Sequence, residues 1–174
     1  MNPRTCLLAP ALMLGACASI QEAPHETHDP HVRQPLLESV KALEGTWESK
    51  GPDGKVQVCE FKVSSAGSVV REIMFPGTPH EMTNLYCLDG NGLALTHYCA
   101  MGNQPHLRAT ARAGNKLDFQ MQSVSDMEAP DEMYMGGLTL EFVDADHMTE
   151  HWRSFVKGEE QKKQGVDIEL ARRK

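Results

Sequence analysis

The sequence predicts an all-β fold, an antiparallel up-and-down barrel of roughly ten strands that follows a short N-terminal helix. Three observations predict it. Short segments rich in strand-forming residues recur after residue 45, turn signals such as Gly-Pro-Asp-Gly and Asp-Gly-Asn-Gly separate them, and no helical segment intervenes. Closing this meander into a barrel pairs strand edges that would otherwise be exposed. The predicted strands are 46–50, 55–63, 68–75, 82–88, 93–99, 106–112, 116–122, 138–143, 147–156 and 165–172.

A short helix is predicted immediately before the strands. Pro35 suits the first position of a helix, because an amide hydrogen there would have no partner. The apolar residues at positions 36, 37, 40 and 43 then share one face, and Gly45 ends the helix. This apolar face is expected to pack against the barrel.

Length and composition indicate one domain with a substantial core. The chain has 174 residues, of which 40% are hydrophobic and 24% charged, a typical balance for a globular domain. The formal net charge of −7 argues against nucleic acid as a partner, because such binding relies on basic residues that neutralise phosphates. No apolar run reaches about 18 residues, which argues against a membrane-spanning helix.

The first seventeen residues resemble the signal sequence of a bacterial lipoprotein. Arg4 supplies a positive charge, residues 6–14 form a short apolar stretch, and Leu14-Gly15-Ala16-Cys17 is similar to the lipobox. The resemblance implies that residues 1–16 are a removed signal peptide and that Cys17 is lipidated and anchors the protein to a membrane. Ala18 follows, rather than the Asp that retains such proteins in the inner membrane, which favours the outer membrane on its periplasmic side. The alternatives are an ordinary signal peptide and a chance apolar start of the chain.

Residues 17–34 are predicted to be a tether and residues 35–174 the barrel domain. The tether is polar and contains prolines, so it has little apolar surface to bury. His25, His28 and His31 recur every three residues in it, a spacing compatible with metal binding but more typical of a solvated linker. No metal site is therefore predicted.

Strand alternation separates an inner from an outer face of the barrel. If Val63 opposes Ser68 across the first hairpin, Glu60 opposes Arg71 as an ion pair on the outer face. The predicted inner face is mostly apolar and continues through the following hairpins. It comprises Cys59, Phe61, Val63, Val70, Glu72, Met74, Met82, Asn84, Tyr86, Leu88, Leu93, Leu95, His97, Cys99, Leu107, Ala109, Ala111, Leu117, Phe119 and Met121.

The polar members of this inner face are the candidate ligand site. The register places Glu72 opposite Tyr86 and Asn84 opposite His97, with Cys99 beside them. A carboxylate inside a barrel is costly unless it is paired or hydrogen-bonded. Ala109, predicted beside His97, would leave space for a ligand. A satisfied structural network without a ligand is an equally weighted alternative.

Loop residues extend the candidate site. His80, Asn103 and Gln104 lie in segments that enter or leave the inner strands, and they would cap the cavity if those loops lie at its open end. The acidic segment 123–137 is predicted to be a long loop that covers the mouth.

Two catalytic hypotheses are weaker than binding. Cys99 and His97 point the same way, but a nucleophile needs a lowered thiol pKa, and a buried structural cysteine is the commoner case. His147-Met-Thr-Glu-His151 matches a zinc-peptidase pattern that requires a helix, whereas on a strand the two histidines stand about 13 Å apart. We reject this motif. No disulfide pairing among Cys59, Cys87 and Cys99 is predicted.

Gly45-Thr46-Trp47 resembles the Gly-x-Trp opening of calycins, the lipocalin-like barrels. In that family an arginine of the closing strand packs across the tryptophan, and Arg172 matches by parity. Residues 75–82, 96–99 and 102–105 are similar to an uncharacterised bacterial lipocalin-like family, and the resemblance covers roughly residues 40 to 172. The resemblance implies a lipocalin-like barrel but no established activity.

The function predicted from these observations is that of a lipid-anchored cell-envelope barrel that binds a small, partly apolar ligand, without a cofactor. Glu72, Asn84, Tyr86 and His97 would orient the polar end of the ligand. The alternatives are an enzyme with acid–base or thiol chemistry in the same interior, a haem or metal carrier with His97 as ligand, and a structural lipoprotein with a filled barrel.

Overall fold

The computed structural model describes the backbone of residues 30–174 and the side chains of residues 35–174. The predicted signal peptide, the predicted lipidation site Cys17 and residues 18–29 of the predicted tether lie outside the described residues. The helix is α1 (Pro30–Lys41), and Ser65–Gly67 form a short 3-10 turn. The strands are β1 (Gly45–Lys50), β2 (Val56–Ser64), β3 (Val69–Met74), β4 (Met82–Asp89), β5 (Gly92–Tyr98), β6 (Gln104–Ala109), β7 (Arg112–Ala113), β8 (Lys116–Ser125), β9 (Tyr134–Phe142), β10 (His147–Val156), β11 (Glu159–Glu160) and β12 (Val166–Arg172).

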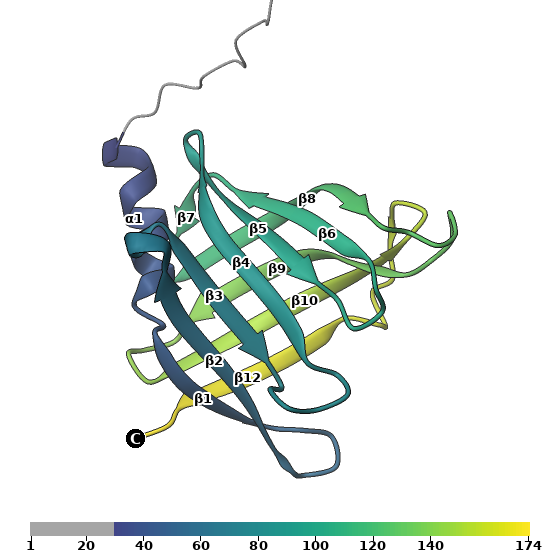
Figure 1. Ribbon diagram of the computed structural model, residues 1–174, viewed down its shortest axis with the longest axis horizontal. Helices are drawn as coiled ribbons and strands as arrows, with labels where there is room; N and C mark the ends of the chain where they lie inside the picture. Colours follow the sequence, from purple (N-terminus) through teal and green to yellow (C-terminus); the bar gives the residue numbers. More distant parts are fainter. Residues whose placement is uncertain (1–29) are drawn as a thin grey trace, which may run out of the picture.

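The strands form a closed antiparallel barrel, as predicted (Figure 1). Strands β1 to β6 pair in sequence, β8, β9, β10 and β12 continue the sheet, and β12 returns to β1 to complete ten strands. The two-residue strands β7 and β11 add to the edges of β8 and β10. The meander follows from the short turns between alternating segments, which leave no room for a crossover connection.

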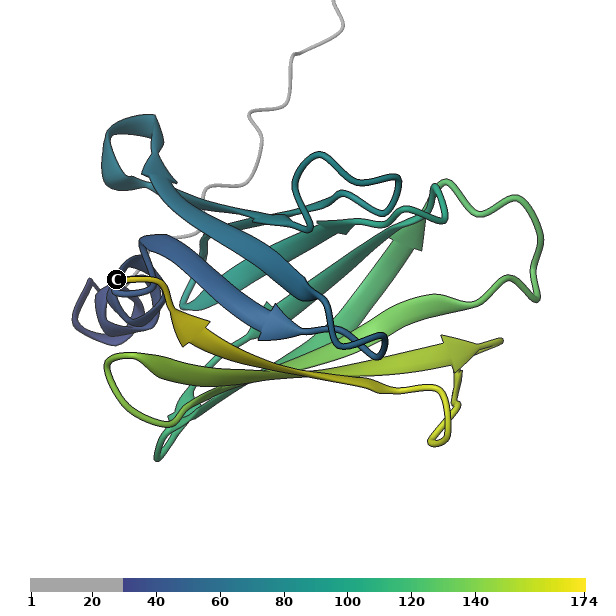
Figure 2. The ribbon, with the colours of Figure 1, turned by 90° about the horizontal axis from the view of Figure 1, so that it is seen from below.

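The two ends of the barrel differ. Helix α1 lies across the end at which β1 begins and β12 ends, as both views of the ribbon show (Figure 2). Its four apolar residues, Leu36, Leu37, Val40 and Leu43, are buried there. The opposite end carries the longer loops 51–55, 75–81, 99–103, 126–133 and 157–165. The helix therefore closes one end, and only loops cover the other.

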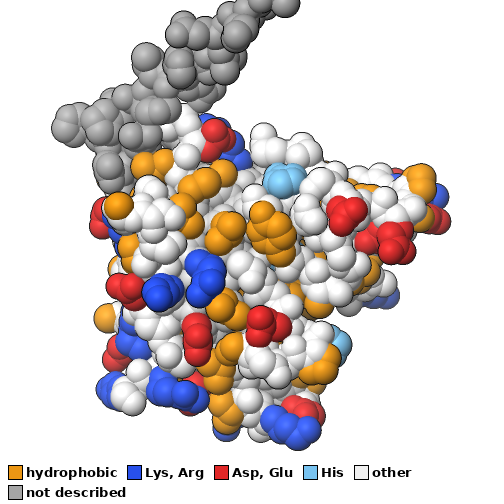
Figure 3. Space-filling view, viewed as in Figure 1, with side chains coloured by type: hydrophobic (Ala, Val, Ile, Leu, Met, Phe, Trp, Pro, Cys, Tyr) orange, Lys and Arg blue, Asp and Glu red, His pale blue; other side chains and the backbone are white. Residues whose placement is uncertain are grey.

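The inner face agrees with strand alternation except at Ala111, which was predicted to face inward but is exposed beyond the end of β6. Buried apolar side chains from every strand of the barrel fill the interior together with those of α1. They include Trp47, Phe61, Val70, Met74, Leu93, Leu95, Leu107, Phe119, Leu138, Leu140, Met148, Ile168 and Leu170. On the side of the barrel over β2–β6, hydrophobic, polar and charged side chains are interspersed (Figure 3).

The register of the first hairpins differs from the prediction by two residues. Val63 pairs with Val70 rather than Ser68, so Lys62, not Glu60, stands opposite Arg71, and the predicted ion pair is wrong. The reason is the turn, in which three successive residues from Ser65 to Gly67 adopt positive φ angles and lengthen the loop. A shift of two residues preserves the faces, because side chains alternate with a period of two.

Two element boundaries also differ from the prediction. Helix α1 begins at Pro30 instead of Pro35, so residues 30–34 are helical. The predicted loop 123–137 shortens to residues 126–133, because β8 continues to Ser125 against β6 and β9 starts at Tyr134. Gly136 serves close packing in β9, since a Cβ there would lie 2.5 Å from the ring of Phe155.

The predicted contact between Arg172 and Trp47 is confirmed. The guanidinium lies 4.3 Å from the centre of the indole ring, and it donates to the carbonyl oxygens of Ala42, Glu44 and Ala145 at 2.8, 2.7 and 3.2 Å. Trp47 Nε1 donates to the carbonyl of Leu43 at 2.7 Å. These contacts attach the end of α1 to the seam where the barrel closes.

Replacement of Arg172 by Met is expected to lower the free energy of unfolding by about 2–3 kcal/mol. Met keeps the apolar stem, but three carbonyl groups lose a charged donor and Trp47 loses its cation. Urea denaturation measures the loss. Arg71→Met, on the exposed outer face of β3, is the matched control and should change the stability by less than about 0.5 kcal/mol. A loss of similar size in both variants would contradict a special role for Arg172.

Within residues 30–174, no helix is long and apolar enough to cross a membrane.

Candidate functional site

Five polar side chains meet inside the barrel and define the candidate site, which we call the interior cluster. They are Glu72 on β3, Asn84 and Tyr86 on β4, His97 on β5 and Glu150 on β10, each at most 1% exposed. The first four belong to the predicted site, and the structure brings them together. Each sits at an inward position of its strand, so alternation places it in the core despite its polarity.

A chain of hydrogen bonds joins the four predicted residues. Glu72 Oε2 accepts from Asn84 Nδ2 at 2.7 Å and from the Tyr86 hydroxyl at 2.8 Å. On its other side, Asn84 Oδ1 lies 2.7 Å from His97 Nδ1. Asn84 pairs with Glu72 and with His97 on the neighbouring strands. The prediction that Asn84 faces His97 is therefore confirmed, whereas the prediction that Glu72 faces Tyr86 is wrong, because Tyr86 pairs with Val70.

This chain determines the tautomer of His97. Because Asn84 directs its amide nitrogen at the Glu72 carboxylate, its oxygen must face His97 and accept a hydrogen from Nδ1. His97 Nε2 then carries no hydrogen and can only accept. It is buried without a hydrogen-bond partner among the described residues. Burial lowers the pKa of His97 from 6.5 to about 4, so the ring is neutral near pH 7.

Glu150 adds a second carboxyl group from across the barrel. Its Oε2 accepts from Trp152 Nε1 at 2.9 Å, and it hydrogen-bonds with Glu72. Burial raises the pKa of both carboxyl groups, and the nearby Glu72 charge raises that of Glu150 further. Since Glu72 accepts more hydrogen bonds, it is the carboxylate of the pair, and Glu150 holds the proton.

The pair thus carries one negative charge that lacks a basic partner. None of the ion pairs formed by the described side chains includes Glu72 or Glu150. Glu72 Oε1 and Glu150 Oε1 accept no hydrogen bond from any other described residue, so the proton on Glu150 is the hydrogen that the two groups share. Hydrogen bonds alone compensate the charge, which is an expensive arrangement inside a protein.

Aromatic rings and a thiol complete the surroundings of the cluster. The Trp152 ring lies 4.7 Å from the His97 ring, and Phe119 packs edge-on against Tyr86 at 5.7 Å. The pKa of the buried Cys59 thiol is raised by burial and by the nearby Glu72 and Glu150 carboxyl groups. Cys59 is therefore a protonated, unreactive part of this wall.

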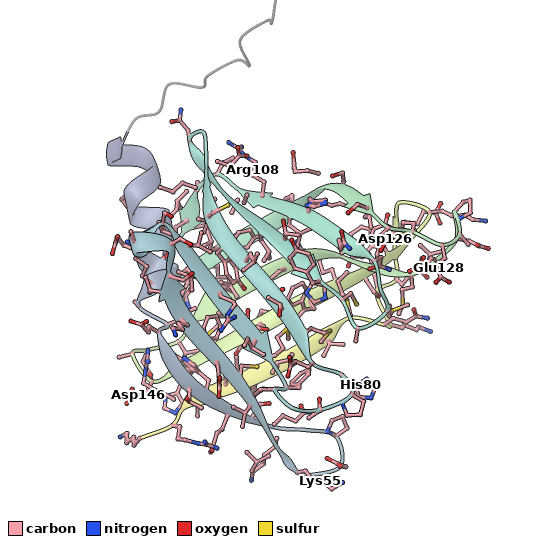
Figure 4. The ribbon with its side chains drawn as sticks, viewed as in Figure 1. Lys55, His80, Arg108, Asp126, Glu128 and Asp146 are labelled. Atoms are coloured by element: carbon pink, nitrogen blue, oxygen red, sulfur yellow. The ribbon has the colours of Figure 1, made fainter. Side chains whose placement is uncertain are left out.

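The remaining predicted site residues lie outside the interior cluster. His80 is exposed on the β3–β4 loop, at the outer edge of the molecule (Figure 4). Asn103 is buried and donates to Glu132 Oε1 and to the carbonyl of Met133, so it holds two rim loops together. Gln104 accepts from Ser125 across β6 and β8. All three lie at the end opposite α1, where they were expected to cap the barrel.

Cys99 follows the end of β5 and is half-buried. Partial burial, with a smaller contribution from the Glu132 carboxylate, raises the pKa of its thiol. A nucleophilic thiol requires the opposite shift. The prediction that Ala109 lies beside His97 is also wrong, since Ala109 pairs with Leu93 near the helix end of the barrel.

The sequence analysis missed Glu150, although a signal was present. Glu150 belongs to the rejected zinc motif, whose two histidines lie on the outer face of β10, four residues apart. Along this strand Met148, Glu150, Trp152 and Ser154 are buried. The same alternation that identified Glu72 would have placed Glu150 inside.

A groove lies where the barrel wall is weakest, and none of the residues of the interior cluster lines it. Strands β1 and β12 pair through only two residue pairs, Trp47 with Arg172 and Glu48 with Ala171. Beyond them a groove of about 1020 Å³ opens between the two strands. Its lining includes the inward-facing Ser49, Met148, Ile168 and Leu170, together with Gln57 and Phe75. The hydroxyl of Ser49 is buried without a hydrogen-bond partner in the described protein.

The described residues contain no group of three or more His, Cys, Asp or Glu side chains arranged to hold a metal ion. His97 Nε2 is the ring nitrogen of the interior cluster whose lone pair is available to a ligand. Cys59, Cys87 and Cys99 are free thiols.

Fold and site together define a class of protein, a closed ten-stranded antiparallel barrel with a buried, acceptor-rich polar cluster. Comparison with protein-family models and with curated proteins found no match to this chain.

Proposed function

We propose that this protein is a lipocalin-like binding barrel, held at the bacterial cell envelope by lipid on Cys17, and that it binds a small, partly apolar ligand. The interior cluster orients the polar end of the ligand. The groove between β1 and β12 receives the apolar part. Glu72, Asn84, Tyr86 and His97 are the binding residues carried over from the sequence, and Glu150 joins them.

The observation that carries the proposal is the unsatisfied lone pair of His97 Nε2 beside an unpaired carboxylate charge. A buried polar atom without a partner costs about 1–3 kcal/mol. A ligand that supplies the missing donor offsets this cost, so binding and stability are coupled. A purely structural network would satisfy its buried polar atoms without a ligand.

The groove supports an entry path to the cluster. Met148 lines the groove, and Glu150 is the next inward residue along the same strand, about 6.7 Å further on. Ile168 and Leu170 provide apolar surface opposite Ser49. In the proposed binding mode, a ligand with its apolar body in the groove points its polar end at Glu150, which is not itself part of the groove lining.

Native mass spectrometry tests the binding function on a soluble form that starts at Ala18 and contains all described residues. After incubation with cell extract, the wild type is expected to retain a small mass that the variant Glu72→Gln with His97→Leu loses. The matched control, Glu60→Gln with His80→Leu, makes the same changes at exposed positions and should retain it. Equal retention by both variants, or none by the wild type, would refute the proposal.

Membrane anchoring requires a separate test on the full chain. Wild type expressed in a bacterium is expected in the membrane fraction with an N-terminal mass increase from acylation. Cys17→Ser is expected to abolish both. A membrane-associated, unmodified Cys17→Ser protein would show that another feature holds it there.

A further inference from the structure

Resting on the proposed binding function, we propose that the polar end of the ligand is a protonated amine. The ammonium group donates hydrogen bonds to Glu72, Glu150 and His97 Nε2. The ligand class is thus narrowed from a small, partly apolar molecule to a small apolar amine.

The first argument is an inventory of hydrogens in the interior cluster. Asn84 Nδ2 donates to Glu72 and, more weakly, to the sulfur of Met74 at 3.5 Å. The hydroxyl of Tyr86 and the indole nitrogen of Trp152 each donate to a carboxyl group. His97 Nδ1 donates to Asn84, and the proton on Glu150 lies in its hydrogen bond with Glu72. These side chains leave no donor over, and the nearby Cys59 thiol is only a weak one.

The atoms that remain are acceptors. They are His97 Nε2, which has no hydrogen-bond partner among the described residues, and the lone pairs of Glu72 and Glu150 that their shared proton leaves free. A ligand carboxylate, phosphate or carbonyl brings only further acceptors. A hydroxyl brings one donor, whereas an ammonium group brings three.

Charge provides the second argument. The carboxyl pair holds a negative charge with no cation from the described residues beside it. A buried charge is stabilised most by an opposite charge in direct contact. An ammonium ion provides that charge, and an anion would be repelled.

The aromatic surroundings favour an organic cation. The Trp152 ring lies 4.7 Å from the ring of His97, with the two ring planes inclined by 44°, and indole faces attract ammonium groups. The groove lined by Met148, Ile168 and Leu170 suits an attached hydrocarbon chain. A bare metal ion would use neither feature, and the described side chains offer no three-ligand group for one.

The test compares three probes with the same six-carbon chain, hexylamine, 1-hexanol and hexanoate, by calorimetric titration of the soluble form at pH 7.5. Hexylamine is expected to bind at least tenfold more tightly than 1-hexanol, because hydrogen bonds to charged groups are the stronger ones. Hexanoate is expected not to bind.

Two variants locate the binding. Glu72→Gln with Glu150→Gln removes the interior charge with little change of shape, and it should weaken hexylamine binding about tenfold to a hundredfold. Glu60→Gln with Glu159→Gln removes two exposed carboxylates and should leave the affinity unchanged. Unaltered affinity of the interior variant would overturn the amine assignment.

A measurement on the wild type keeps the test decisive if the interior variant does not fold. Hexylamine should shift the nitrogen resonance of His97 Nε2 in ¹⁵N-labelled protein, with saturation at the calorimetric affinity. An unshifted resonance would overturn the assignment. So would binding of 1-hexanol or hexanoate in preference to hexylamine, but that result would leave the proposed binding function intact. If none of the probes binds, the amine assignment is wrong and mass spectrometry alone decides the binding function.

Discussion

Acidification from pH 7 to pH 4 is expected to cost the barrel about 3 kcal/mol of stability through His97 alone. The pKa of His97 is about 4 in the folded protein, against 6.5 for an exposed histidine. At about 1.4 kcal/mol per pH unit, this difference gives the expected loss. The folded protein loses this stability because its buried imidazole stays neutral, whereas the unfolded chain gains free energy by binding a proton at His97.

The sign follows from proton binding. Between pH 4 and pH 6.5 the unfolded state binds a proton at His97 that the folded state excludes, so the free energy of unfolding rises with pH in this interval. Glu72 and Glu150 act in the opposite direction. Their pKa values are raised in the folded state. Their contribution to the free energy of unfolding is therefore complete below about pH 4.5, and it is lost as the pH rises through their pKa values in the folded protein.

Comparison of wild type with His97→Asn isolates the histidine, because the carboxyl pair is present in both. Urea denaturation at pH 4, 5, 6 and 7 should show that the variant loses about 3 kcal/mol less than the wild type on acidification. Asn retains a donor toward Asn84. His80→Asn, at an exposed rim position, should keep the acid dependence of the wild type. An identical acid dependence in His97→Asn and wild type would show that the imidazole is not held neutral by the interior.

Most of the fold could be predicted because alternation and turn residues are local signals. A period of two determines which side chains point inward, and it correctly placed Glu72, Asn84, Tyr86 and His97 in the core. Alternation survives a register error of two residues, which is why these residues were placed correctly although the first hairpin was misaligned. The turn conformation that sets the register depends on backbone angles at Ser65 and Ala66 that no hydrophobic pattern encodes.

The proximity of Glu72 and Glu150 could not be predicted in the same way. They lie on β3 and β10, which are not neighbours in the sheet, and they meet only because the barrel closes. Local patterns give the face of each residue but not its depth along the barrel axis or the strand it meets across the interior. The contact between Trp47 and Arg172 is a long-range contact that was predicted, because it came from the calycin resemblance and not from a local pattern.

The largest effect of a conservative substitution is expected for Asn84→Asp. The change replaces one NH₂ group by an oxygen, which turns the donor that faces Glu72 Oε2 at 2.7 Å into an acceptor. At pH 8 the variant buries a further negative charge against an existing one, and we expect it to lose about 3–5 kcal/mol of stability. At pH 5 a proton on the introduced carboxyl group restores a donor, so part of the loss should be recovered.

Asn115 provides the matched control for this change. Its Nδ2 also donates to a carboxylate, that of Glu141, at 3.4 Å, but on the exposed surface. Asn115→Asp should therefore cost less than about 1 kcal/mol at either pH, since water screens the repulsion. Thermal and urea denaturation of both variants at pH 5 and pH 8 measure the difference. A small, pH-independent loss in Asn84→Asp would mean that Glu72 is protonated at pH 8 and donates to the introduced carboxylate. The interior cluster would then be neutral, and the charge that we assign to its ligand would lose its physical basis.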